Sequence, residues 1–208
     1  MLTLFKYRCF TSTTDRDRVR DTLFRQEVYC PTPAELDDPY DCNIGTADHL
    51  MGMFVNCGVF CTSGPQHNDI LLFSQYADSH TGIALVFTVD DGKIIGDSTF
   101  LSFSNRITYV HDFPVFDKRN IHKVLWTKYA AWEYQDEYRV IANLDQDSKK
   151  CRRFEKYELT QIRFGLRMTE DDQRTIIQWA HDAGLTDIKF LKARPRKDKF
   201  QLVYDEVQ

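Results

Sequence analysis

Gln135 and Glu137 stand two residues apart near the centre of the chain, in the aromatic-rich segment Trp132–Arg139. The pattern changes there from helical to strand-like, and side chains at positions i and i+2 of an extended strand point to the same face. Both groups can therefore face one cleft, flanked by rings that limit water. An amide beside a carboxylate suits a site that holds a target group next to a developing positive charge. The structural alternative is a salt bridge between Glu137 and Arg139 or a lysine.

Other polar side chains stand at the ends of predicted strands. Arg8 lies at the end of the first strand, and Thr62 and Ser63 end a middle strand. An arginine can hold a pyrophosphate through its planar guanidinium group, hydroxyls can support a ring and a ribose, and a lone carboxylate can stabilise an oxocarbenium ion. Together these groups meet the needs of cleaving NAD. The structural alternatives are a surface arginine and ordinary strand-end hydroxyls.

The stretch from Asp38 to Cys61 contains acidic residues, a histidine and cysteines, but its spacing argues against a metal site because it holds no C-x-x-C pair. We therefore predict no bound metal. A metal-dependent hydrolase or nuclease built on Asp38, Asp41 and His80 stays an alternative. The role of the loop from Asp38 to Cys42 is open, since Asp41 can bind substrate or hold an Asx-turn. His80 can contact ligand or cap a helix, and a structural histidine is the favoured interpretation.

Composition narrows the class of protein. The chain has 208 residues, 42% of them hydrophobic, which suffices for one domain with a substantial core. The apolar runs are too short to span a membrane, the first residues lack a secretory signal, and the six cysteines do not resemble a disulfide scaffold. We therefore expect a soluble, cytoplasmic protein with no membrane partner. None of the nine glycines falls in a phosphate-binding loop motif, which disfavours Rossmann dehydrogenases and P-loop enzymes.

Charge is distributed unevenly along the chain. The net charge is -4, yet residues 149–200 hold 14 basic and 8 acidic side chains. Aromatic residues such as Phe154, Tyr157 and Phe200 stand beside these cations and are available for stacking on bases. This basic C-terminal part could contact RNA or DNA. The favoured alternative is a solvated face and a turn between two strands.

Hydrophobic periodicity predicts more strands than helices. The longer predicted strands cover residues 2–10, 58–63, 82–89 and 137–144, and shorter strands bring the number of strands above that of the helices. The predicted helices cover residues 14–26, with Thr14 as N-cap, 47–56, 68–77, with Asn68 or Asp69 as cap, 120–132 and 170–183. The chain shows no repeat, low-complexity tract or linker, so we expect a single α+β domain over residues 1–208.

Three motifs follow one another along the chain. They are an arginine on the first strand, Cys61-Thr62-Ser63 at the end of a middle strand and Gln-x-Glu at a later strand. This order resembles the R-S-E class of ADP-ribosyltransferases, which includes bacterial toxins. In that class the middle strand leads into a helix and another strand, and residues 60–63, 70–76 and 82–87 show the same sequence. The resemblance implies an ADP-ribosyltransferase-like domain with a mixed or antiparallel split sheet and flanking helices. This chain has Cys61 where the class motif has serine.

The resemblance also implies the role of each residue toward NAD as substrate. Tyr7, Arg8, Thr62, Ser63 and Tyr76 would bind NAD: the arginine would hold its phosphates, the two hydroxyl residues would shape the nicotinamide side, and Tyr76 would line the nicotinamide pocket.

The catalytic residues implied by the resemblance are Glu137 and Gln135. Glu137 would hold the ribose 2′-hydroxyl and stabilise the cation as nicotinamide leaves. Gln135 would orient the acceptor.

A second resemblance covers most of the chain. It is carried by Leu4–Arg8, Asp38–Cys42, Ser74–Gly82 and Trp132–Arg139. These segments are similar to the sequence motifs of a large bacterial family that carries only a domain-of-unknown-function label. Members typically have glutamate at the position of Gln135, which the transferase class also accepts, and tryptophan where this chain has phenylalanine at position 73.

Together the two resemblances imply a bacterial enzyme that transfers ADP-ribose from NAD to a macromolecule. Such an enzyme suits a toxin or a phage-defence effector neutralised by a cognate antitoxin. The basic C-terminal part favours RNA or DNA as the acceptor, whereas Gln-x-Glu in related toxins often accompanies protein acceptors. The rival hypotheses are a non-catalytic module that binds nucleic acid or a partner through the basic part, and the metal-dependent hydrolase or nuclease.

Overall fold

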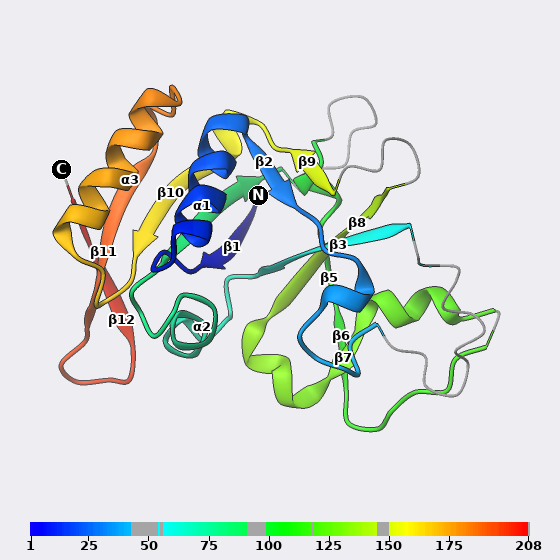
Figure 1. Ribbon diagram of the computed structural model, residues 1–208. Coiled ribbons are helices and arrows are strands. Elements are labelled where there is room, and N and C mark those ends of the chain that lie inside the picture. The colour runs from blue at the N-terminus through cyan, green and yellow to red at the C-terminus, as the bar shows by residue number, and fades with distance from the viewer. Residues whose placement is uncertain (43–53, 55, 91–98, 118, 145–149, 208) are drawn as a thin grey trace.

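A curled, mostly antiparallel sheet of eight strands forms the body of the molecule (Figure 1). The strand order is β12-β11-β10-β4-β1-β3-β8-β5, and among these neighbours only β10 and β11 run parallel. The expected α+β class with a mixed sheet is confirmed. The computed structural model describes residues 1–42, 54, 56–90, 99–117, 119–144 and 150–207.

The elements follow one another along the chain with strands in the majority. The strands of the large sheet are β1 (Leu2–Arg8), β3 (Cys57–Ser63), β4 (Ile83–Val89), β5 (Asn105–Arg106), β8 (Glu137–Asn143), β10 (Leu159–Phe164), β11 (Lys189–Pro195) and β12 (Leu202–Glu206). Two small sheets pair β2 (Glu27–Tyr29) with β9 (Cys151–Arg153) and β6 (Thr108–Val110) with β7 (Thr127–Tyr129). The α-helices are α1 (Thr13–Arg25), α2 (Asp69–Tyr76) and α3 (Glu170–Asp182). Short 3-10 segments are η1 (Pro33–Glu35), η3 (Leu101–Phe103), η4 (Ile121–Trp126), η5 (Ala130–Gln135) and η6 (Lys156–Glu158).

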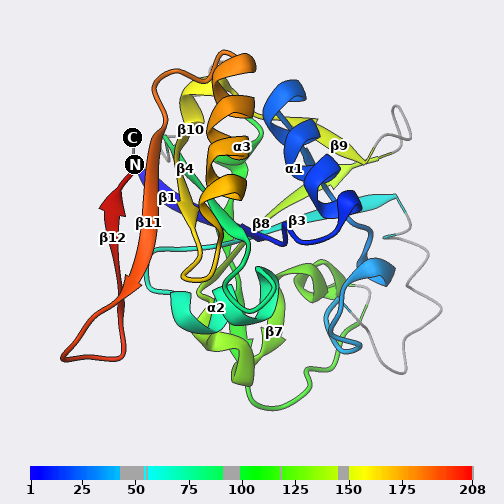
Figure 2. The same cartoon turned by 60° about the vertical axis from the view of Figure 1, so that its left-hand side comes forward.

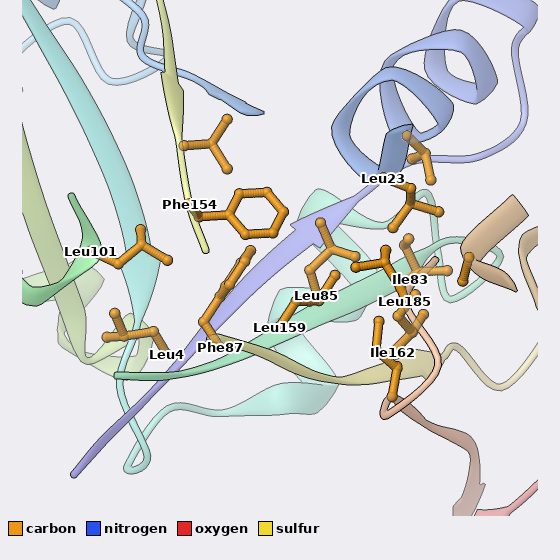
Figure 3. Close-up of a cluster of buried hydrophobic side chains, with 14 of the residues drawn as sticks. Leu4, Leu23, Ile83, Leu85, Phe87, Leu101, Phe154, Leu159, Ile162 and Leu185 are labelled. Atoms are coloured by element: carbon orange, nitrogen blue, oxygen red, sulfur yellow. The ribbon is translucent and has the colours of Figure 1, made fainter. Parts of the chain in front are cut away.

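The period of two along the central strands sorts their side chains between the two faces of the sheet. On β1 and β4, Leu4, Leu85 and Phe87 join the larger core with the buried faces of α1 and α3. Figure 3 shows several of these side chains packed between the strands and Leu23 of α1. Figure 2 shows α1 and α3 side by side on this face. The other face of the strands packs against α2, where Phe73 belongs to the second core.

Local capping explains where the helices begin. The Ser12 side chain accepts a hydrogen bond from the backbone N–H of Asp15, so α1 begins at Thr13 and the predicted Thr14 cap is wrong. The Asn68 side chain accepts a hydrogen bond from the backbone N–H of Leu71 and caps α2, as predicted. The predicted helix over residues 47–56 lies almost entirely outside the described residues.

The predicted helix over residues 120–132 is wrong. The structure has η4, the short strand β7 and then η5 in its place. The segment is rich in aromatic and β-branched residues, which have low helix propensity. In addition, Lys128 is buried with its ammonium group at 2.7 Å from the Glu137 carboxylate, and this contact outweighs local preference.

The sheet opens between β1 and β3. β1 pairs with β4 along its whole length, and β3 pairs with β8 along its whole length. Between β1 and β3 the register contains only the pair Phe5 and Ser63. The two strands therefore diverge from this point, and within the described part of the chain no strand pairs with the edge of β1 from Lys6 to Arg8 on that side.

The basic C-terminal part does not form one surface in the described residues. β9 lies beside β2, whereas β11 and β12 lie at the far edge of the large sheet (Figures 1 and 2). Several of its cations pair with nearby acids: Lys150 with Glu35, Arg194 with Asp205, and Arg196 with Asp198. Its positive charge is therefore divided and partly neutralised.

We predict that Gly82→Ala destabilises the fold and disturbs the end of β1. A methyl group on Gly82 would lie 2.1 Å from the Arg8 carbonyl oxygen, so backbone must move. The expected loss in free energy of unfolding is about 1–3 kcal/mol, measured by urea denaturation. Thr81→Ser keeps the neighbouring hydroxyl and serves as the control. Equal stability of Gly82→Ala and wild type would contradict the close approach.

Candidate functional site

A cleft of about 530 Å³ opens where β1 and β3 diverge. This volume falls in the range of small-molecule sites. Figure 1 shows β1, β3 and β8 as neighbouring strands in the middle of the molecule. The structure brings together all the residues that the sequence analysis expected to bind NAD or to act in catalysis, namely Tyr7, Arg8, Thr62, Ser63, Tyr76, Gln135 and Glu137.

Glu137 belongs to a buried group of four charged side chains, here called the ionic cluster: Asp41, Lys128, Glu137 and Arg139. The Glu137 carboxylate accepts hydrogen bonds from Lys128 Nζ at 2.7 Å and from Arg139 Nε at 2.5 Å. Arg139 Nη2 lies 2.7 Å from both Asp41 carboxylate oxygens, and Lys128 Nζ lies 3.4 Å from one of them. Two acids and two bases make the ionic cluster neutral.

The charges of the ionic cluster reinforce one another. Burial alone would raise the pKa of Glu137, but Arg139 and Lys128 outweigh it and lower the pKa to about 2. Burial alone would lower the pKa of Lys128, yet the carboxylates of Glu137 and Asp41 raise it above its ordinary value. The pKa of Arg139 is likewise raised despite burial, chiefly by Glu137. These three groups are therefore charged at neutral pH.

The Gln135 amide is held at both ends. Its Oε1 accepts a hydrogen bond from Lys128 Nζ at 2.9 Å, and its Nε2 donates to the Tyr76 hydroxyl at 2.8 Å. Since an ammonium group can only donate, Lys128 fixes which end of the amide is the oxygen. Burial raises the pKa of Tyr76 to about 12, so its hydroxyl stays protonated. Gln135 thus links the ionic cluster to α2.

Two cations in the cleft form no ion pair with a carboxylate of the described residues. Lys6 and Arg8 stand two residues apart on β1 and line the cleft. Lys6 Nζ donates to the Cys61 carbonyl at 2.7 Å, and within the described residues neither side chain forms an ion pair. Burial, and then the charge of Arg8, lowers the pKa of Lys6 to about 8. Burial, and then Arg18, lowers the pKa of Arg8 to about 10. This side of the cleft suits an anion.

The hydroxyl groups of Thr62 and Ser63 differ in whether they are free to form a hydrogen bond with a ligand. Ser63 lies opposite Glu137 in the register of β3 and β8, and its hydroxyl has no hydrogen-bond partner among the described residues. The Thr62 hydroxyl donates to the Tyr138 carbonyl at 3.2 Å. Ser63 is therefore the hydroxyl that a ligand can engage.

Tyr7 borders the cleft, but its side chain packs in the second core. Its ring meets Phe73 edge-on at 4.9 Å, and its hydroxyl is hydrogen-bonded to His67 Nε2 at 2.7 Å. The Tyr7 hydroxyl is thus engaged within the protein, and the residue supports the strand that carries Arg8.

The structure assigns roles to the two features that the sequence left open. The Asx-type hydrogen bond in the loop from Asp38 to Cys42 runs from the Tyr40 N–H to Asp38 at 2.9 Å, whereas Asp41 anchors the loop to the ionic cluster. His80 does not line the cleft, and its buried ring stacks on Phe73 at 5.7 Å. The structural interpretation of His80 fits this position.

Sequence reasoning missed Lys6 and Lys128 and assigned Arg139 only as a salt-bridge partner. For Lys6, the spacing of two from Arg8 was an available signal, because the segment was predicted as a strand. For Lys128 no signal was available, because the segment was predicted as helix and its partners lie in distant parts of the chain.

The described residues contain neither a metal-binding cluster nor a membrane-spanning helix. Among these, no group of three or more histidine, cysteine, aspartate and glutamate side chains is arranged to hold a metal ion. Nor does any helix in this part of the chain have the length and apolar character needed to cross a membrane.

We predict that Glu137→Gln destabilises the protein in a pH-dependent way. At neutral pH the change leaves two buried cations with one carboxylate fewer, and the expected loss is about 3 kcal/mol. The folded pKa of Glu137, about 2, lies below the ordinary value of 4.5. The stability from ionised Glu137 is therefore complete above pH 4.5 and is lost as the pH falls toward 2. Urea denaturation should show that the difference in free energy of unfolding between wild type and variant decreases over this range. A constant difference argues against the prediction.

We predict that Arg8→Met leaves the free energy of unfolding unchanged or higher while removing anion binding. The substitution removes a half-buried charge that has no carboxylate partner among the described residues. Binding of inorganic pyrophosphate, measured by calorimetry, should weaken about tenfold or more. Arg20→Met changes an exposed arginine of α1 that does not line the cleft and should alter neither property. Large destabilisation by Arg8→Met would mean that Arg8 is structural.

Comparisons of this chain with protein-family models, with curated proteins and with solved structures found no match. The side chains that line the cleft, and their chemistry, are therefore the basis on which a function is proposed.

Proposed function

We propose that the cleft binds NAD and that the protein, with an ADP-ribosyltransferase-like fold, transfers ADP-ribose to a macromolecular acceptor. The observation that carries the proposal is the convergence of Arg8, Ser63 and Glu137 on one cleft. The three residues come from β1, β3 and β8, which are neighbours in the sheet. The cationic side of the cleft, at Lys6 and Arg8, is suited to the pyrophosphate, and the Ser63 and Glu137 side is suited to the ribose.

In the proposed reaction the bond between the ribose anomeric carbon and the nicotinamide nitrogen breaks, and its electron pair leaves with nicotinamide. The resulting oxocarbenium ion is attacked by an acceptor nucleophile, which then loses a proton. Glu137 is ionised at neutral pH, since its pKa is about 2. Its two oxygens each accept one hydrogen bond from the ionic cluster, and a carboxylate has about four lone-pair sites. A lone pair thus remains to accept the ribose 2′-hydroxyl.

The biological setting is part of the proposal and comes from the family resemblance. It implies a bacterial toxin or phage-defence effector that acts in the cytoplasm and is neutralised by an antitoxin. The acceptor is a nucleic acid or a protein. The divided charge of the basic C-terminal part removes one reason for preferring RNA or DNA.

A non-catalytic binding module is the second candidate, and one observation favours it. Lys128 and Arg139 each donate a hydrogen bond to Glu137 in a neutral ionic cluster, which weakens the field that this carboxylate can exert on a cation. Such a module would bind an anionic nucleotide at Lys6 and Arg8 without breaking it. In contrast, Asp41 is bound within the ionic cluster and His80 lies outside the cleft, so the hydrolase hypothesis has no comparable support.

The experiment is nicotinamide release from NAD by the purified protein, with total cellular RNA or total cellular protein as acceptor. Wild type is compared with Glu137→Gln and with Asp41→Asn. Asp41→Asn removes a carboxylate from the same ionic cluster and thereby controls for loss of stability. We expect release by wild type, loss of about a hundredfold or more in Glu137→Gln, and a smaller loss in folded Asp41→Asn.

The outcomes separate the two candidates. If wild type binds NAD but releases no nicotinamide with either acceptor, the binding module is the correct function. Equal losses in the two variants would assign Glu137 a structural role. A gain of mass by RNA or by protein identifies the acceptor class.

A further inference from the structure

A second pocket, of about 280 Å³, adjoins the cleft. We call it the side pocket. Its walls include five aromatic residues and two acids, namely Tyr40, Phe113, Phe116, Tyr129, Trp132, Asp38 and Asp112. Asp38, Lys128 and Trp132 line both the side pocket and the cleft, so the two spaces share a wall. The side pocket is built from the loop before residue 43, β6, the segment after β6, η4, β7 and η5.

The aromatic walls expose more ring surface than a core residue would. Tyr40 is 69% exposed, Phe113 is 49% exposed and Tyr129 is 54% exposed. The rings of Tyr40 and Phe113 meet edge-on, with centroids 6.2 Å apart. Isolated exposed rings are common on protein surfaces, but several around one hollow are typical of a binding surface.

The charges around the side pocket favour a positively charged occupant. Asp38 and Asp112 contribute carboxylates, and Asp112 is exposed. Lys128 is the only lysine or arginine among the described residues that line the pocket, and the ionic cluster already neutralises it. A phosphate here would meet two carboxylates of like charge, and among the described lining residues His111 is the one basic side chain that the ionic cluster does not engage.

We propose that the side pocket binds an arginine side chain of a protein acceptor, next to the site where NAD would lie. A guanidinium group is planar and stacks on aromatic faces, and its N–H groups donate to carboxylates. The aromatic rings and Asp112 supply these two kinds of contact together. That the bound protein is an acceptor of ADP-ribose rests on the proposed function, but binding of the arginine side chain does not.

The test is a titration in the absence of NAD with two blocked tripeptides, Gly-Arg-Gly and Gly-citrulline-Gly. Citrulline has nearly the same shape as arginine and no charge. Binding is followed at the indole N–H signal of Trp132 by NMR, with Trp132→Phe to assign the signal. The arginine peptide should shift this signal in a saturable way, and the citrulline peptide should bind at least about threefold more weakly.

Two variants and two matched controls locate the contact. Asp112→Asn and Phe113→Ala should each weaken binding of the arginine peptide about threefold or more. Both side chains are exposed, so the fold should tolerate the changes. Asp187→Asn and Phe200→Ala alter an exposed acid and an exposed ring outside the side pocket and should leave binding unchanged.

Equal binding of the two peptides, or no shift with either, overturns the proposal. A single-stranded oligonucleotide that shifts the Trp132 signal when the arginine peptide does not would also overturn it, and would indicate a nucleobase as occupant. Because the titration contains no NAD, its result is independent of nicotinamide release, and either proposal can fail while the other stands.

Discussion

The buried ionic cluster of Asp41, Lys128, Glu137 and Arg139 is the interaction on which the arrangement of the cleft depends. Burying these charges is costly, and removal of one partner leaves an uncompensated charge that costs about 3–5 kcal/mol. The ionic cluster joins the loop before residue 43, β7 and β8, which are distant in the sequence. It therefore fixes one wall of the cleft and the shared wall of the side pocket through charge pairing rather than through apolar packing.

The opposite wall of the cleft follows a different physical rule. Lys6 and Arg8 are desolvated on β1 and have lowered pKa values, and within the described residues neither forms an ion pair with a carboxylate. Such groups reduce stability unless a ligand supplies the missing negative charge. The cleft thus combines a wall that is satisfied within the protein with one that an anion would satisfy. This contrast distinguishes the binding side of the cleft from its structural side.

Short-range pattern explains what could be predicted from the sequence. Short apolar runs located β1, β3, β4 and β8, and one of the two predicted caps of α2, Asn68, was correct, because these features depend on neighbours in the chain. A shared site for Arg8, Ser63 and Glu137 was expected because their order along the chain resembles that of the R-S-E class. Lys128 could not be predicted, because its burial depends on Asp41 and Glu137, and these partners overrode the helical pattern around it. The side pocket likewise depends on contacts between distant segments.

The presence of an amide at position 135 follows from the charge balance of the ionic cluster. Gln135 accepts from Lys128 and donates to Tyr76 without adding charge, so two carboxylates face two cations. A glutamate at this position would place a third carboxylate beside Lys128. Either the buried group would carry a net negative charge, or the new carboxyl would stay protonated with a raised pKa. In this chain the amide therefore keeps the charge of Glu137 balanced by Lys128 and Arg139, and it makes Gln135 part of the same electrostatic unit as Glu137.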